Sequence, residues 1–193
     1  MTLKEVVKCI AKIYEVELPE DDLEHLVAIM SCKTLAKGEL LLAQDRIAKD
    51  LIYVQSGMLR QFYYKKDHDI TEHFTCEGST LAFCIASLFK QQPTDLMIEA
   101  LEPTVIYMIN YEKLKSLSFR YPAIAKLHIS ILEVGLIISQ QKADSWRFET
   151  AKERYERFME EYPQVAGRAS VNHIASYLLM APESLSRVRA GIL

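Results

Sequence analysis

Residues 170–193 read Ser170-Val-Asn-His-Ile-Ala-Ser-Tyr-Leu-Leu-Met-Ala-Pro-Glu-Ser-Leu-Ser-Arg-Val-Arg-Ala-Gly-Ile-Leu193, and this pattern predicts two short helices joined by a tight turn. Ser170 suits the N-cap of the first helix. Pro182 suits the first turn of the second helix, where its missing N–H would have no partner in any case. A short turn between two such helices is typical of a helix-turn-helix, whose second helix enters the major groove of DNA.

The second predicted helix separates its apolar from its polar side chains. Leu185 and Val188 are spaced to face inward, so the polar residues around them face solvent. Glutamate, serine and arginine are residue types that contact base edges or phosphates. We therefore predict DNA contacts from Ser170, Pro182, Glu183, Ser184, Ser186, Arg187 and Arg189. An ordinary helical hairpin with a solvated polar face is the alternative.

The composition is that of a chain that can form a core and carries little net charge. Of its 193 residues 50% are hydrophobic and 25% charged, and the net charge is −3. This charge argues against indiscriminate binding to nucleic acid but permits a local basic surface. No uninterrupted run of about 18 apolar residues occurs, and the N-terminus does not read as a signal peptide. We therefore expect a cytoplasmic protein with no membrane span.

The middle of the chain reads as short strands. Alternating runs predict strands at residues 39–43, 50–55, 58–64, 70–75, 96–101 and 104–109. Their spacing of roughly ten residues predicts a small antiparallel barrel or jelly roll. Helices are expected at residues 3–15 and 20–30 before the strands, and a loop with a short helix at residues 76–89 interrupts them. The predicted fold class is α+β.

Pro122 opens the longest helical pattern of the chain, and a heptad seam runs along it. The seam consists of Ile124, Leu127, Ile131, Val134 and Ile138, and we predict that it forms the interface of a dimer. A second apolar stripe on another face contains Ile129, Leu132, Leu136 and Ile137. One face can pack on the barrel of its own chain and the other on a second subunit; a single wide buried face is the alternative. A hinge is expected at residues 144–148, before a helix over residues 150–162.

The order of barrel, long helix and helix-turn-helix resembles the cyclic-AMP receptor protein and fumarate-nitrate regulator (Crp/Fnr) superfamily. The matching pieces are Leu51-Ile-Tyr-Val-Gln-Ser-Gly-Met-Leu-Arg60, Ile98-Glu-Ala-Leu101, Ile174-Ala-Ser-Tyr-Leu178 and Pro182-Glu-Ser-Leu-Ser-Arg187. The segments Ala151-Lys-Glu-Arg-Tyr155 and 182–189 look like the Bacteroidetes type of these regulators.

The resemblance implies three parts. These are a cyclic-nucleotide-binding-like sensor domain over residues 1–121, a dimerisation helix over residues 122–148 and a helix-turn-helix DNA-binding domain over residues 149–193. It implies that Glu183, Ser184 and Arg187 read bases and phosphates. The implied partners are double-stranded DNA with a palindromic operator, a second copy of the chain, a small-molecule effector and RNA polymerase. The wing that follows the recognition helix in this family is absent or cut short, which implies fewer phosphate contacts.

The sensor region departs from the pattern of cyclic-AMP binders. Those proteins carry a Gly-Glu pair and an arginine next to Ser or Thr, whereas this chain has no arginine between Arg60 and Arg120. Burying a cyclic phosphate without a cation or many hydrogen bonds is costly. The sequence therefore favours another ligand, or none. A ligand pocket is expected from Leu59, Gln61, Tyr63, Glu77, Gly78, Ser79, Phe83, Ser87 and Lys90, unless these residues simply fill the barrel.

The chain offers no strong metal, cofactor or catalytic pattern. Cys9, Cys32, Cys76 and Cys84 contain no C-x-x-C pair, and the two N-terminal cysteines cannot supply the four thiolates of an iron–sulfur cluster. Histidines 25, 68, 73 and 128 leave a haem ligand open. A cupin-like enzyme needs an H-x-H metal motif, and no G-x-S-x-G nucleophile motif occurs. We expect no cofactor, no metal and no enzyme activity. A ligand-binding module whose helical C-terminus contacts proteins is the other alternative.

Overall fold

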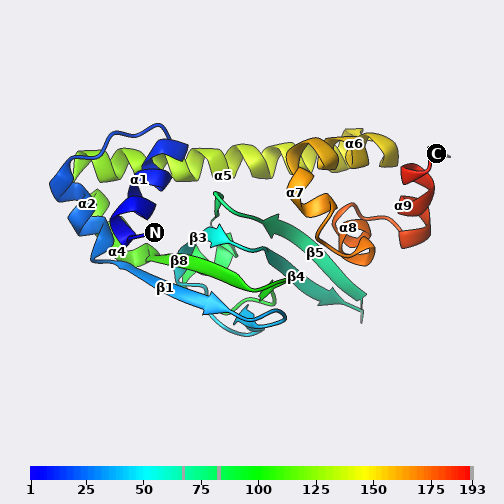
Figure 1. Ribbon diagram of the computed structural model, residues 1–193, viewed down its shortest axis with the longest axis horizontal. Coiled ribbons are helices and arrows are strands. Elements are labelled where there is room, and N and C mark those ends of the chain that lie inside the picture. Colours follow the sequence, from blue (N-terminus) through cyan, green and yellow to red (C-terminus); the bar gives the residue numbers. More distant parts are fainter. Residues whose placement is uncertain (67, 82–83, 192–193) are drawn as a thin grey trace.

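Two antiparallel sheets form the centre of the computed structural model, which describes residues 1–66, 68–81 and 84–191 (Figure 1). One sheet has the order β1-β8-β3-β6, and the other has the order β2-β7-β4-β5. The strands are β1 (Met30–Leu35), β2 (Leu40–Leu42), β3 (Asp50–Ser56), β4 (Leu59–Lys65), β5 (His68–Thr75), β6 (Thr80–Leu81), β7 (Met97–Ala100) and β8 (Thr104–Asn110). The sheets do not join into one closed barrel, so the expectation of a jelly roll is met and that of a closed barrel is not.

The strand pattern of the sequence located most of the sheet. Strands β2, β3, β4, β5, β7 and β8 overlap the predicted runs. Strand β1 was missed, and the helix expected over residues 20–30 ends at Val27 because Met30 already belongs to β1. The burial of β1 does not alternate from residue to residue, so it lacks the two-residue period that reveals a half-buried strand.

Four helices close one end of the sandwich. They are α1 (Leu3–Ile13), α2 (Glu20–Val27), α4 (Tyr111–Ser118) and the first half of α5 (Pro122–Phe148), while α3 (Ile85–Lys90) lies between β6 and β7. Asn110 caps α4, because its side chain accepts from the backbone N–H of Lys113 at 3.1 Å. Side chains of α1, α2, α4 and α5 share one buried core with the inner faces of both sheets.

Helix α5 runs along the length of the molecule; its first half packs into the core of the sandwich, and Lys142 in its second half contacts β5 (Figure 1). Ile124, Leu127 and Ile131 are buried in the core of their own chain, with Ile124 fully enclosed. The prediction that these three residues form the dimer interface is therefore wrong, because they have no surface left for a partner. The seam turns toward the chain's own sandwich, whereas the second stripe faces outward.

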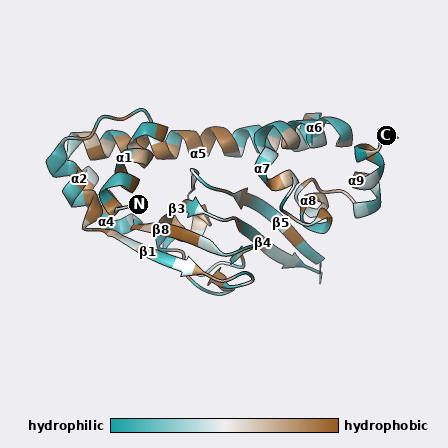
Figure 2. Ribbon diagram, viewed as in Figure 1, coloured by the Kyte–Doolittle hydropathy of each residue, from teal (hydrophilic) through white to brown (hydrophobic). Residues whose placement is uncertain are grey.

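The outward face of α5 is apolar. Ile129 is 54% exposed, Leu136 72% and Ile137 55%, and Val134 of the predicted seam is also exposed. Figure 2 shows that the apolar colouring of α5 extends past the part beside α1 before it becomes hydrophilic toward α6. Among the described residues, α5 alone is long and apolar enough, by length and composition, to cross a membrane. The sequence-based expectation of no membrane span rested on the lack of an uninterrupted apolar run. Helix α5 differs because a few polar residues interrupt its apolar stretch.

The C-terminal region consists of four short helices. They are α6 (Ala151–Glu161), α7 (Pro163–Ala166), α8 (Val171–Tyr177) and α9 (Pro182–Arg189). The expected hinge at residues 144–148 is helical, and the chain turns at Glu149 and Thr150 instead. Thr150 causes the turn, because it forms a reciprocal capping box with Glu153 and so starts a new helix.

Candidate nucleic-acid interface and the cavity beside it

Helices α8 and α9 have the bounds that the sequence predicts for a helix-turn-helix. The side chain of Ser170 caps α8 by accepting from the backbone N–H of His173 at 3.1 Å. Leu179 takes a left-handed conformation with φ of 53°, and Met180 N–H donates to the carbonyl of Ala175 at 3.0 Å. Pro182 then occupies the first turn of α9. The turn between the helices is thus held by local hydrogen bonds.

Helix α9 buries one face and presents the other. Leu185 and Val188 are buried against α8 and α6, as their spacing predicts. The predicted DNA-contacting residues Pro182, Glu183, Ser186, Arg187 and Arg189 are exposed, and Ser184 is half-buried. Ser170 is exposed at the start of α8, where its hydroxyl serves as the cap. Figure 1 places α9 at the end of the molecule far from the N-terminus, with its polar face unobstructed by the sheets.

Ser176 attaches α8 to the edge of the sensor sheet. Its hydroxyl accepts from the backbone N–H of Thr71 at 2.7 Å and donates to the carbonyl of Asp69 at 2.9 Å. Both backbone groups belong to β5, which is the edge strand of its sheet. The backbone groups of an edge strand have no neighbouring strand to bond with on one side. Ser176 supplies the donor and the acceptor that such a strand would have provided.

Arg168 links the C-terminal region to two loops of the sandwich. Its guanidinium donates to both carboxylate oxygens of Glu77 at 2.9 Å and also pairs with Glu102. This ion pair and hydrogen bonds from backbone N–H groups, including that of Gly57, hold the pKa of Glu77 well below its usual value, at about 2. Glu77 is therefore a fixed anion that orients Arg168.

A second apolar core joins the sandwich to the helix-turn-helix. Phe74 of β5 lies 6.3 Å from Phe158 of α6 and 5.6 Å from Tyr177 of α8, measured between ring centroids. Met58 and Cys76 from the sandwich belong to the same cluster, together with Ile174, Ala175 and Leu185. The helix-turn-helix thus shares its core with the sensor domain. The division at residues 121 and 148 into three domains remains a proposal.

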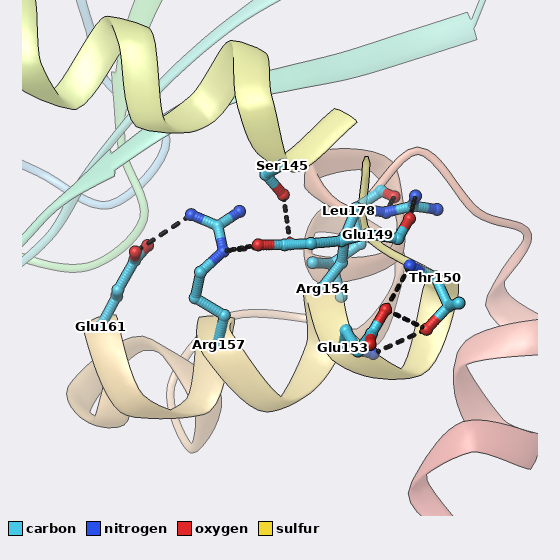
Figure 3. A network of polar contacts seen from close by, with 8 residues as sticks. All are labelled: Ser145, Glu149, Thr150, Glu153, Arg154, Arg157, Glu161 and Leu178. Carbon is cyan, nitrogen blue, oxygen red and sulfur yellow. Dashed lines mark hydrogen bonds and ion pairs between the residues drawn. The ribbon is translucent and has the colours of Figure 1, made fainter. Parts of the chain in front are cut away.

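The junction between α5 and α6 is held by a compact polar network (Figure 3). The carboxylate of Glu149 accepts from the hydroxyl of Ser145 and from Arg157, which also pairs with Glu161 at 3.0 Å. Arg154 donates to the backbone carbonyls of Glu149 at 3.0 Å and Leu178 at 3.2 Å. The direction in which the chain leaves α5 is therefore coupled to the turn of the helix-turn-helix.

Arg60 is the most fully enclosed cation of the sensor domain and was missed by sequence reasoning. Only 2% of it is exposed, and its guanidinium donates to Glu99 at 2.7 Å, to Asp69 at 2.6 and 2.7 Å and to Thr71 at 3.1 Å. An arginine inside a predicted central strand signals such pairing, because this residue type is almost never buried alone. Four of its five N–H groups donate to Glu99, Asp69 and Thr71, so Arg60 is committed to protein partners rather than to a phosphate.

The other predicted pocket residues fall into two groups. Leu59, Gln61 and Ser87 are buried; Gln61 binds Glu72 and the backbone N–H of Cys84, and Ser87 accepts from the N–H of Ala48. Tyr63 is half-buried and Lys90 exposed, and Phe83 lies outside the described residues. These five described residues do not line the cavity that Glu77, Gly78 and Ser79 line. That cavity lies between the sandwich and the C-terminal helices.

This cavity has a volume of about 580 Å³ and three main walls, and Ile13 and Tyr14 at the end of α1 complete its lining. Strand β5 and the loop after it form the first wall, and the second half of α5 forms the second. The third comes from α6, α7 and Tyr177 of α8. One signal for this cavity is visible in the sequence, because the polar residues Gln141, Lys142 and Ser145 interrupt the inward-facing side of α5. A volume of this size is typical of small-molecule sites.

Two titratable groups of this cavity have strongly shifted pKa values. Burial lowers the pKa of His73 to about 3, and the nearby charge of Lys142 lowers it further, so the imidazole is neutral. Burial lowers the pKa of Lys142 to about 8, while the charge of Glu72 opposes this shift. Lys142 is still mostly an ammonium ion at neutral pH.

The described residues contain no cluster of three or more His, Cys, Asp or Glu that could hold a metal. All four cysteines are thiols, and Cys76 and Cys84 are buried. Burial raises the pKa of the Cys76 thiol to about 11 and that of Cys84 to about 12, which makes both poor nucleophiles.

The central segment of the chain resembles a known family. Residues 32–121 match the family described as the cyclic nucleotide-binding domain. A search among curated proteins gave no significant match.

Solved structures share this arrangement over most of the chain. FixK2 from Bradyrhizobium japonicum has a TM-score of 0.70 at 20% identity, covering 85% of this chain and 84% of that one. The c-di-GMP-responsive global regulator CLP from Xanthomonas campestris has a TM-score of 0.67 at 16% identity, covering 90% and 91%. A Eubacterium rectale protein described as a Crp/Fnr-family transcriptional regulator has 0.65 at 17% identity, covering 90% and 83%. The chain has the Crp/Fnr fold, as the resemblance implied; the narrower Bacteroidetes likeness stays an expectation.

Proposed function

We propose that the protein is a dimeric transcription regulator that binds palindromic DNA through α9. The observation that carries this proposal is the exposed face of α9, which presents Arg187 and Arg189 to solvent. The buried side chains of Leu185 and Val188 hold the helix against its neighbours. Arginine in a major groove pairs with guanine through two hydrogen bonds. The Crp/Fnr fold supports this reading, and the partner is then double-stranded DNA in the cytoplasm, with RNA polymerase as a further partner.

The outward face of α5 supports the dimer. Ile129, Leu136 and Ile137 are exposed apolar side chains, with Glu133 among them, on a helix whose opposite face is already buried. Exposed patches of this kind mark interaction sites. Two helix-turn-helix modules fixed on one dimer raise each other's effective concentration on a palindrome with half-sites about 34 Å apart.

A membrane is the other environment that could cover this face. Against it stands the packing of α5 on its own chain, because Ile124, Leu127 and Ile131 are enclosed by the sandwich. Lys142 also donates to the carbonyl of Glu72 on β5. A spanning helix would lose all of these contacts, so we infer that the exposed face meets a second copy of the chain.

The sensor interior does not suit a cyclic nucleotide in this proposal. Arg60 is held by Asp69 and Glu99, and Gln61 and Ser87 are bound to protein groups. A cyclic phosphate placed there would lack a free cation, which makes its burial costly. We infer that the effector is a different small molecule or that none binds, and that the protein is not an enzyme.

The proposal is tested by selecting binding sites from a random DNA library at two salt concentrations. Arg187→Ala should lower specific affinity about tenfold or more and relax one base pair in each half-site, because a bidentate guanine contact is worth about 1–3 kcal/mol. Arg189→Ala should weaken binding to all sequences and flatten the salt dependence, as loss of a phosphate contact does. An unchanged site preference and affinity after Arg187→Ala would refute the assignment of α9.

Sedimentation tests the dimer separately. Leu136→Glu should produce monomers, because the charge would enter the apolar face without a partner. Phe119→Glu is the matched control, since Phe119 is an exposed apolar side chain outside α5. A dimer that survives Leu136→Glu would show that this face has another role.

A further inference from the structure

The cavity between the sandwich and the C-terminal helices lies outside the sheet sandwich, and its lining comes from four parts of the chain, including Ile13 and Tyr14 at the end of α1. Thr75 and His73 belong to β5, Lys142 belongs to α5, and Tyr162 and Tyr177 belong to the C-terminal helices. The apolar lining comes from Val134 and Ile138 of α5 and from aromatic rings. The cavity therefore offers flat apolar surface next to a few polar groups, as small-molecule sites do.

Lys142 carries a charge that is only partly compensated, by the carboxylate of Glu72, which forms no ion pair with it. Its ammonium group donates to the backbone carbonyl of Glu72 and lies 5.0 Å from the ring centre of Trp146 and 5.2 Å from that of Tyr177. Lys142 forms no ion pair with any residue that the structure describes. A largely buried ammonium normally finds a counter-charge, because burial without one is costly. The adjoining cavity is the space in which a counter-charge can enter.

Two further polar atoms in the wall have no partner. The hydroxyl of Thr75, a residue only 2% exposed, makes no hydrogen bond with the described residues, and neither does Nδ1 of His73. His73 and Thr75 are two residues apart on β5, so their side chains lie on the same side of the strand. Both residues line the cavity. Buried polar groups are nearly always paired in native proteins. Rotation of the Thr75 hydroxyl toward the cavity would provide a donor in its wall.

The remaining charges at the cavity set an upper limit on the charge of a ligand. Glu77 is paired with Arg168, and Glu161 is paired with Arg157. Glu160 at the rim is exposed and forms no ion pair among the described residues. A ligand with several negative charges would meet these carboxylates, whereas one negative charge is matched by Lys142.

We propose that this cavity binds a small aromatic monocarboxylate, whose carboxylate pairs with the ammonium of Lys142 and whose ring packs beside Tyr162 and Tyr177. The bound molecule touches β5, α5 and the helix-turn-helix together, so it stabilises the docked position of α8. If the proposed DNA-binding function holds, the ligand thereby biases how α9 is presented, because a ligand favours the state to which it binds better.

Calorimetry on the full chain tests the binding without DNA, so its failure is distinguishable from failure of the proposed regulator function. The probe is 2-naphthoate, and its neutral amide, 2-naphthamide, is the matched ligand control. Naphthoate should bind, and naphthamide should bind about tenfold or more weakly, because a hydrogen bond to a charged group is worth about 1.5–3 kcal/mol. Inorganic phosphate should give no measurable binding, because it lacks the ring.

Protein variants locate the site. Lys142→Met keeps the length of the side chain and should lower naphthoate affinity about tenfold or more. Lys126→Met, an exposed lysine on the same helix, should leave the affinity unchanged. Absence of naphthoate binding to the wild type, equal binding of naphthamide or of phosphate, or full affinity in Lys142→Met would each overturn the proposal. The two ligand comparisons use the wild-type chain, so they decide the question even if a variant fails to fold.

Discussion

Arg60 and Lys142 are both buried cations that contact strand β5, yet their surroundings differ. Arg60 is enclosed by Asp69 and Glu99 and donates from Nε, Nη1 and Nη2. Lys142 has one carbonyl and two aromatic rings, with a cavity beside it. Arg60 is a fully paired part of the fold, because removing it would leave the carboxylates of Asp69 and Glu99 uncompensated. Lys142 has no ion-pair partner among the described residues, and unsatisfied polar groups of this kind cluster at functional sites.

The largest effect should follow from removing Arg60. Arg60→Met should destabilise the protein by about 3–5 kcal/mol, because breaking a buried ion pair leaves a charge without a partner. The free energy of unfolding, measured with urea, checks this value. Arg147→Met, a change at an exposed arginine, should alter it by less than about 0.5 kcal/mol. A loss at Arg60 no larger than at Arg147 would remove the contrast with Lys142.

An intermediate effect is expected at the contact between α8 and β5. Ser176→Ala should cost about 1–3 kcal/mol, because the backbone N–H of the buried residue Thr71 loses its acceptor. Ser116→Ala is the control, since its exposed hydroxyl donates only to a carbonyl of its own helix. Hydrogen exchange at Thr71 should also accelerate in Ser176→Ala. If both variants are equally stable, the serine does not complete the edge of the sheet.

The smallest effect at neutral pH should come from Lys142→Met, within about 1 kcal/mol of the wild type, because the lost contacts are offset by removal of a buried charge. The effect should depend on pH. The pKa of Lys142 is about 8 in the folded protein and near 10.5 when unfolded. The unfolded chain then binds more protons between these values, so this group makes stability rise as pH increases from about 8 to 10.5.

Unfolding of wild type and Lys142→Met across this pH range isolates the contribution of Lys142. The groups that face it are Glu72 and His73 on β5 and Tyr177 on α8, and they are present in both proteins. The wild type should gain stability relative to the variant as pH rises. Parallel pH curves for the two proteins would mean that the ammonium is not penalised by burial, and the difference from Arg60 would disappear.

The sequence alone determined the elements whose signals are local. The bounds of α8 and α9 follow from Ser170, the left-handed turn and Pro182, and α4 begins where Asn110 caps it. Short apolar runs between turn residues located six strands, although β3 and β4 are buried at consecutive positions rather than at every second one. The resemblance to Crp/Fnr regulators rested on the order of these elements, and the fold confirms it.

Only the tertiary structure decided which face of α5 is inward, because two apolar stripes on one helix are equivalent until one of them meets the sandwich. It also decided that Arg60 is neutralised, since Asp69 and Glu99 approach it through strand pairing that the sequence does not display. The cavity at Lys142 was hidden for the same reason. Its walls come from residues far apart along the chain, and their contact depends on how α8 docks on the edge of β5.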